Sequence, residues 1–240
     1  MSGAGAAPCL GLIVPPASGA VPSDGAVLYG ERVRFIARGL GIAAISPEGF
    51  APVVDRIVGH ALALRDEGAQ AISLMGTSLS FYRGAARTEA LRAHMAEATG
   101  LPCTTMSHAV VAALRQLGVR RVAVATSYID TLNERLESYL RDCGFIVTAI
   151  AGLSITGVEA VGQVSTEALV GLSERVWRQD PSAEGIFISC GGLLTLDAIR
   201  TLEDRLGVPV TASSPAGFWD LVRLSGDDAS SPGFGRLFAR

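Results

Sequence analysis

Long hydrophobic runs and blocks of like charge are missing from this sequence. Its 20 basic and 23 acidic residues give a formal net charge of −3 and are spread along the chain, so we expect no nucleic acid and no membrane surface as a partner. The apolar run at residues 9–14 is far shorter than the ~20 residues that a membrane span needs. No basic segment precedes this run, and we therefore expect a cytoplasmic protein.

Motifs for metals, nucleotides and activated serines are missing as well. The four cysteines, at positions 9, 103, 143 and 190, show no CxxC or CxxH spacing, which in a cytoplasmic protein predicts free thiols. The three histidines, at positions 60, 94 and 108, stand far from other candidate ligands, so we predict no metal site. The chain contains no P-loop, HExxH motif or GxSxG elbow, which argues against nucleotide binding and serine hydrolysis. We expect neither a metal nor an organic cofactor.

Apolar residues are plentiful, at 49%, and can form a substantial core. Short apolar runs alternate with segments of helical period, as in parallel strands joined by crossover helices. The predicted strands are residues 9–14, 42–46, 70–75, 102–105, 121–126, 145–150, 185–189 and 208–212. The predicted helices are residues 50–67, 84–98, 107–117, 130–143, 165–179, 195–206 and 215–225. Residues 25–41 are interpreted as a loop over a ligand cleft.

A weak internal repeat indicates two similar halves. Residues 71–76 align with residues 185–190, and residues 100–107 align with residues 207–214. We therefore predict an α/β fold of two pseudo-symmetric, Rossmann-like halves with parallel sheets.

The predicted first half comprises residues 1–116 plus 214–240, and the second comprises residues 117–213. The last helix is expected to return to the first half through apolar residues such as Phe218 and Leu221. No association motif is evident, and we expect a monomer.

Ligands of parallel sheets bind beyond the carboxyl ends of the strands. Two facing halves would bring four strand-end segments around one cleft. These segments are Val14–Pro16, Gly76–Ser78, Thr126–Tyr128 and Cys190–Gly192.

Cys190 is the strongest candidate for a working side chain. It ends a predicted buried strand, and the glycines that follow allow backbone N–H groups, such as that of Gly191, to approach a carboxylate. The alternative for any cysteine is a small core residue, which is the expected role of Cys9 and Cys103.

The other polar candidates have structural alternatives. Thr77 and Ser78 can bind a carboxylate or simply cap a helix, and Tyr128 can donate a hydrogen bond or only pack. The isolated carboxylates of Asp24, Glu48 and Asp130 are expected to be solvated or to cap helices.

Four strings carry a resemblance over nearly the whole chain. They are VPP at residues 14–16, MGTSLSFYRG at 75–84, SCGGLLTLD at 189–197 and SSPAGFW at 213–219. The sequence thereby resembles the bacterial arylmalonate decarboxylases, of the aspartate/glutamate racemase superfamily.

The resemblance implies cofactor-independent loss of carbon dioxide from a 2-aryl-2-methylmalonate and enantioselective protonation by Cys190. It implies that Thr77, Ser78, Tyr128 and backbone N–H groups near Gly191 hold one carboxylate and the enediolate. The implied apolar pocket for the other carboxylate consists of Ile42, Ile45, Met75, Leu79, Val158 and Val161. The aryl ring would lie near Pro15, Gly76 and Gly191.

Two alternatives stay open. The resemblance implies that racemases and isomerases of the superfamily use two cysteines, one from each half. In this chain, the repeat places Gly76 where the second cysteine would be. This argues for protonation from one face. A non-catalytic protein that binds small carboxylic acids would need the hydroxyls but no thiol.

Overall fold

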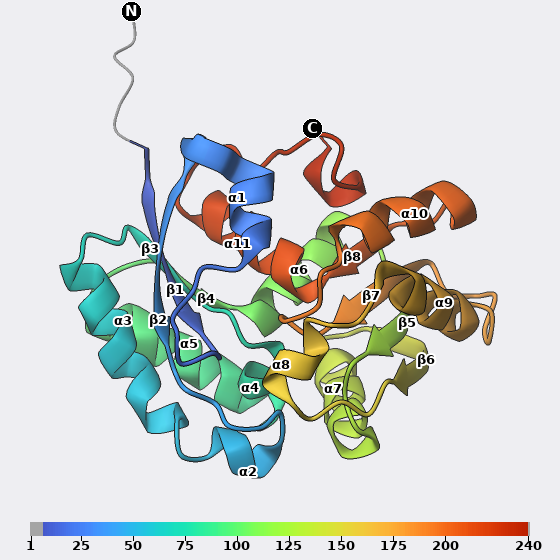
Figure 1. Ribbon diagram of the computed structural model, residues 1–240, viewed down its shortest axis with the longest axis horizontal. Helices are drawn as coiled ribbons and strands as arrows, with labels where there is room; N and C mark the ends of the chain where they lie inside the picture. Colours follow the sequence, from blue (N-terminus) through green and yellow to red (C-terminus); the bar gives the residue numbers. More distant parts are fainter. Residues whose placement is uncertain (1–6, 240) are drawn as a thin grey trace, which may run out of the picture.

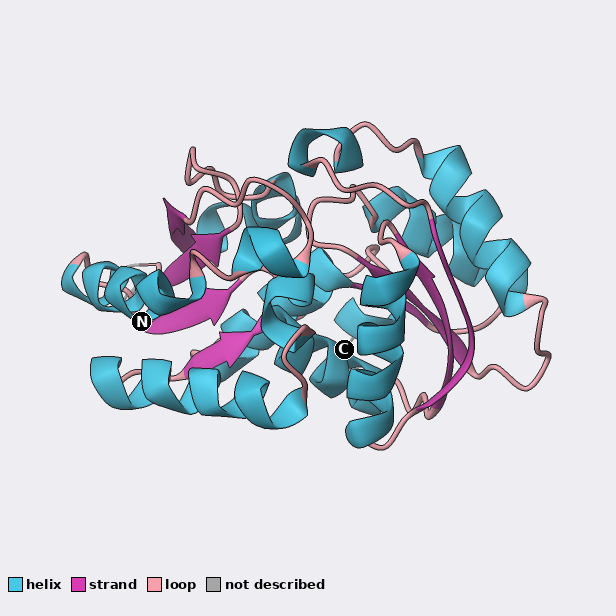
Figure 2. Ribbon diagram, turned by 90° about the horizontal axis from the view of Figure 1, so that it is seen from below, coloured by secondary structure: helices cyan, strands magenta, loops and turns pink. Residues whose placement is uncertain are grey.

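The computed structural model describes residues 7–239. They form two parallel sheets of four strands, ordered β2-β1-β3-β4 and β6-β5-β7-β8, with helices packed around them (Figures 1 and 2). The strands are β1 Cys9–Val14, β2 Arg34–Gly39, β3 Ala71–Leu74, β4 Cys103–Thr105, β5 Arg121–Thr126, β6 Ile146–Gly152, β7 Gly185–Ser189 and β8 Val210–Ala212. The predicted α/β class with two like halves is confirmed.

The longer helices cover the sheets, and the short helices lie in the connections. The longer ones are α1 Ser23–Tyr29, α3 Ile57–Asp66, α5 Ala85–Thr99, α6 Met106–Gln116, α7 Asp130–Asp142, α9 Thr166–Trp177, α10 Leu196–Leu206 and α11 Ser213–Leu224. The short ones are α2 Pro47–Phe50, α4 Thr77–Phe81 and α8 Val158–Val161, with 3-10 turns at Gly30–Arg32, Val54–Arg56 and Arg236–Phe238. Within residues 7–239 no helix combines the length and apolarity needed to cross a bilayer.

The predicted strand at residues 42–46 is wrong, and so is the predicted loop at residues 25–41. The chain instead forms α1 and then β2, which pairs with β1 alone at the edge of the first sheet. An edge strand is half-exposed and tolerates charge. The arginines in β2 interrupt the apolar run by which a strand is predicted, so this strand was not predicted. Residues 42–46 are apolar for another reason, because Ile42 and Ile45 line a cavity.

Helices α6 and α11 pack against each other between the two sheets (Figure 1). Each begins directly after the last strand of its own sheet and also contacts the last strand of the other sheet. Helix α11 further packs on β3 and α1, and its buried Phe218 meets Phe35 edge to face, with the ring centroids 4.9 Å apart. A hydrogen bond of 2.7 Å from Thr104 of β4 to the buried carboxylate of Asp220 also joins α11 to the first sheet.

We predict that Phe218→Ala destabilises the protein by about 3–5 kcal/mol, because it removes a fully buried ring and leaves a cavity. Val27→Ala in the neighbouring α1 is the control, since Val27 is 51% exposed and should change the free energy of unfolding by less than about 0.5 kcal/mol. Urea denaturation measures both. Equal stability losses would contradict the packing of α11 described above.

Candidate active site

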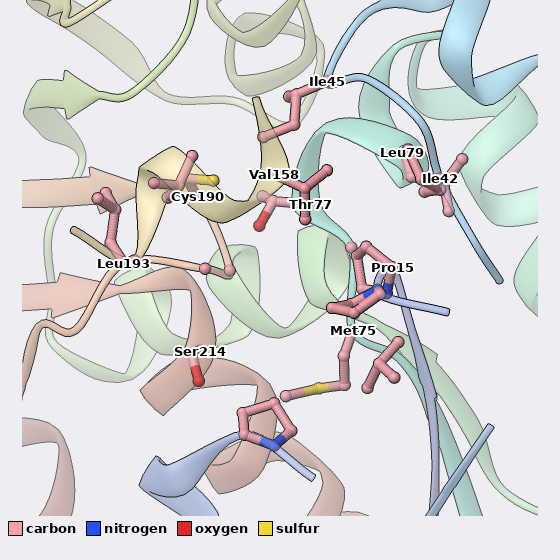
Figure 3. Close-up of a pocket in the computed structure, with 18 of the residues that line it drawn as sticks. Pro15, Ile42, Ile45, Met75, Thr77, Leu79, Val158, Cys190, Leu193 and Ser214 are labelled. Carbon is pink, nitrogen blue, oxygen red and sulfur yellow. The ribbon is translucent and has the colours of Figure 1, made fainter. Parts of the chain in front are cut away.

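A cavity of about 470 Å³ opens at the carboxyl ends of β1, β3 and β7, which is the usual ligand position in parallel α/β sheets. The first residues of α1 and α11, the loop around Ile42 and the short helix α8 complete its walls. Figure 3 shows Cys190 and Leu193 across the cavity from Pro15 and Leu79. The cavity therefore lies between the two halves.

Cys190 follows β7 and its side chain is buried, with 6% exposure. Its backbone has φ of 152°, a region that residues with a side chain rarely occupy. Its N–H donates to Ser213 Oγ at 3.1 Å. Burial raises the pKa of the Cys190 thiol, and the neighbouring Ser127 hydroxyl, Gly192 N–H and Tyr128 hydroxyl oppose that rise in part. The thiol is thus held neutral, as a proton donor needs to be.

The turn after β3 offers hydroxyls and amides to the cavity. Gly76 occupies the cap position of α4 and provides no capping side chain, so the first N–H groups of the helix lack a local partner. Thr77 Oγ1 donates to Met106 Sδ at 2.9 Å, a weak acceptor that a carboxylate can replace. The Thr77 carbonyl accepts hydrogen bonds from Ser80 (2.8 Å) and Ser107 (3.0 Å), which hold the turn in place.

Tyr128 lies behind the cavity wall and is fully buried. Its hydroxyl oxygen accepts a hydrogen bond from Ser189 at 3.3 Å. Burial, and next the adjacent Cys190, raise the pKa of Tyr128 well above its ordinary value, although Thr77 and Ser78 hydroxyls near it act in the opposite direction. The phenol is therefore a neutral donor next to the turn after β3.

Aliphatic side chains form a further part of the wall. Ile42 and Ile45 are each 8% exposed and Leu79 is 2% exposed. The Ile42 N–H donates to the Pro15 carbonyl at 3.0 Å, and the Ile45 N–H donates to the Thr156 carbonyl at 3.0 Å. The latter bond ties the loop of the first half to the segment that precedes α8, so the aliphatic wall spans both halves.

The structure gathers the predicted site residues around this one cavity, with one exception. Those that line it are Pro15, Ile42, Ile45, Met75, Gly76, Thr77, Ser78, Leu79, Val158, Val161, Cys190 and Gly191. Tyr128 does not line it, and neither do Thr126 and Ser127 from the same segment. Within residues 7–239, no three His, Cys, Asp or Glu side chains are grouped so that they could hold a metal ion.

Sequence reasoning missed two buried polar residues of the wall, Asp24 and Ser214. Asp24 was expected to be solvated or to cap a helix, but it is 5% exposed, in the first turn of α1. The Pro-Ser-Asp sequence at residues 22–24 is a signal for a helix start that would have located α1. The other two carboxylates, Glu48 and Asp130, are exposed in first helical turns, as expected.

Fold and cavity together define a class, the two-half α/β proteins with a ligand cavity between the halves and a buried thiol in it. The arylmalonate decarboxylase family model matches residues 10–238. Arylmalonate decarboxylase from Bordetella bronchiseptica is 58% identical over 232 residues, which cover 96% of each chain. The chain belongs to the arylmalonate decarboxylase family, whose members are carboxy-lyases.

Solved structures agree with this assignment. A liganded double mutant of arylmalonate decarboxylase, with one glycine changed to cysteine and one cysteine to serine, is 57% identical, with a TM-score of 0.95 over 96% of this chain and 98% of that one. The maleate isomerase Iso from Pseudomonas putida S16 superposes with a TM-score of 0.89 over 96% of this chain and 98% of that one. At 23% identity the isomerase shows a shared fold alone.

We predict that Cys190 is alkylated by iodoacetamide with a midpoint at higher pH than that of a small free thiol. Its raised pKa means that the reactive thiolate forms only as the pH rises through that value. Ser127→Ala should move the midpoint higher still, because the Ser127 hydroxyl beside the thiol favours the thiolate. Site-resolved mass spectrometry measures the rate at each pH. A midpoint near neutral pH would contradict the description of Cys190 as a neutral thiol.

Proposed function

We propose that the protein converts 2-aryl-2-methylmalonates into carbon dioxide and enantiopure 2-arylpropionates, with no metal or organic cofactor. The observation that carries this proposal is the position of one thiol. Of the four cysteines, all within the described residues, Cys190 alone lines the cavity. Around it, hydroxyls and amides occupy one part of the wall and aliphatic groups another.

One carboxylate of the substrate is proposed to bind at the turn after β3. Thr77 and Ser78 supply hydroxyls and N–H groups there, Gly191 supplies a further N–H, and the neutral phenol of Tyr128 supports them from behind. When carbon dioxide leaves, this carboxylate becomes an enediolate with charge on both oxygens. Donors fixed in place before the reaction stabilise that charge without reorganising.

The other carboxylate is proposed to face the aliphatic wall. An ion there lacks hydrogen-bond donors, whereas neutral carbon dioxide needs none. Breaking the bond between the central carbon and this carboxylate releases carbon dioxide and leaves the bonding electron pair on the substrate. The aryl ring and the bound carboxylate share that electron pair. Burial among Ile42, Ile45 and Val158 therefore favours cleavage.

Cys190 is proposed to complete the reaction by proton transfer. The Sγ–H bond breaks, a C–H bond forms at the central carbon, and the electron pair of the S–H bond stays on sulfur as a thiolate. A proton from water then restores the thiol. Because the thiol stands on one side of the cavity, one enantiomer is expected.

A racemase or isomerase would need a second acid or base on the opposite face. The turn after β3 carries Gly76 at the position that the repeat pairs with Cys190, so no thiol is available there. A protein that only binds carboxylates would not require Cys190 at all. Release of carbon dioxide when the purified protein is mixed with phenylmalonate distinguishes decarboxylation from the other two functions and is the first experiment to perform.

We predict that Cys190→Ser lowers the decarboxylation rate at least about 100-fold, because a hydroxyl is a far weaker acid than a thiol. Cys143→Ser is the matched control, since Cys143 is outside the cavity and its variant should keep the parent rate. Carbon dioxide release under saturating phenylmalonate measures both. Turnover near the parent rate in Cys190→Ser would remove this residue from the mechanism.

We further predict that Gly76→Cys combined with Cys190→Ser yields the opposite enantiomer. Gly76 has φ of −138°, which any residue adopts, and an added Cβ would lie 3.2 Å from Leu79 Cβ and 3.6 Å from Pro15 Cγ, so a small shift admits the side chain. Chiral chromatography of the acid formed from an aryl methylmalonate gives the result. An active double variant that makes the parent enantiomer would mean that residues 76 and 190 do not face opposite sides of the intermediate.

A further inference from the structure

The carboxyl of Asp24 lines the cavity but has few partners. It lies in the first turn of α1 with 5% exposure, and burial raises its pKa, partly offset by the neighbouring Ser214 hydroxyl. Ser214 Oγ is itself buried and has no partner at hydrogen-bond distance among the described residues. Buried polar groups in proteins are nearly always hydrogen-bonded. Asp24 and Ser214 are short of hydrogen-bond partners in a ligand cavity, which indicates that a polar group of the ligand forms the missing hydrogen bonds.

The Asp24–Ser214 pair occupies a different region of the cavity from the groups proposed to react. In Figure 3, Ser214 lies on the side of the cavity away from Ile45 and Val158. A substrate held by one carboxylate at Thr77, with its aryl ring near Pro15 and Gly191, extends its ring toward this pair. The ring edge is the part of the substrate that can meet Asp24.

We propose that Asp24 and Ser214 form a polar subsite that selects arylmalonates whose ring carries a hydrogen-bond donor, such as a phenolic hydroxyl or a heteroaromatic N–H. This inference rests on the proposed function and names its substrate class. A donor on the ring satisfies the Asp24 carboxylate, which accepts but cannot donate when ionised. Ring substituents that only accept, such as fluorine, leave it unsatisfied, and an anionic substituent is repelled.

The test compares kcat/KM for 3- and 4-hydroxyphenyl methylmalonates with the corresponding fluorophenyl compounds. A hydrogen bond to a charged group is worth about 1.5–3 kcal/mol, so the unmodified enzyme should prefer a hydroxyl at one of these positions by about 10–100-fold. Asp24→Asn should reduce that ratio several-fold, because the charge is lost, and Ser214→Ala should reduce it less. Comparing one ratio across variants cancels the electronic effect of the substituent.

Glu159→Gln is the matched control, since Glu159 is a second carboxylate of the cavity wall but an exposed one, and it should keep the ratio. If phenylmalonate is turned over but no hydroxyl preference exists, or if the preference persists unchanged in Asp24→Asn, the subsite is refuted and the proposed function stands. If no arylmalonate releases carbon dioxide, the proposed function fails. Calorimetric binding of hydroxyphenylacetate against fluorophenylacetate then decides the subsite alone, and equal affinities would refute it.

Discussion

The packing of α6 against α11 is the contact on which the cavity depends. Each helix begins at the last strand of its own sheet and reaches the last strand of the other, so the carboxyl ends of the two sheets are held facing each other. The first residues of these helices also serve the site directly. Met106 accepts the Thr77 hydroxyl, and Ser213 accepts the N–H of Cys190. The contact that joins the halves thereby also positions the groups between them.

Exclusion of water by this packing acts on the buried titratable groups at the cavity. Burial raises the pKa of Cys190, Tyr128 and Asp24 alike. For the thiol and the phenol this preserves the neutral form, which donates a proton or a hydrogen bond. For Asp24 it makes the ionised form costly without a donor. Burial thus keeps Cys190 and Tyr128 as neutral donors, and it leaves the Asp24 carboxylate beside α11 without enough hydrogen-bond donors.

The regular parts of the fold could be predicted from the sequence, because strands buried on both faces read as continuous apolar runs. Strand β2 could not, since it lies at an edge and contains charge. Gly25 misled in a similar way. It is typical of loops, yet it lies in α1, where glycine is needed because an added Cβ would come within 2.7 Å of the Phe218 ring. The site residues at strand ends could be predicted, because the topology of a parallel sheet places them at one edge. The inward position of Asp24 could not, because it depends on helix α1, and no local pattern of apolar residues indicates that helix.

Proteins with this fold can carry out different reactions with only small changes in their side chains. Maleate isomerase superposes closely at low identity, so the arrangement of strands does not select the reaction, and the side chains at the strand ends have to. In this chain the turn after β7 carries a thiol, and the equivalent turn after β3 carries a hydrogen atom at Gly76. The backbone at Gly76 is of a kind open to any residue, and its neighbours leave nearly enough room for a side chain. A site with one acid and a site with two would thus differ by a single side chain within the same backbone.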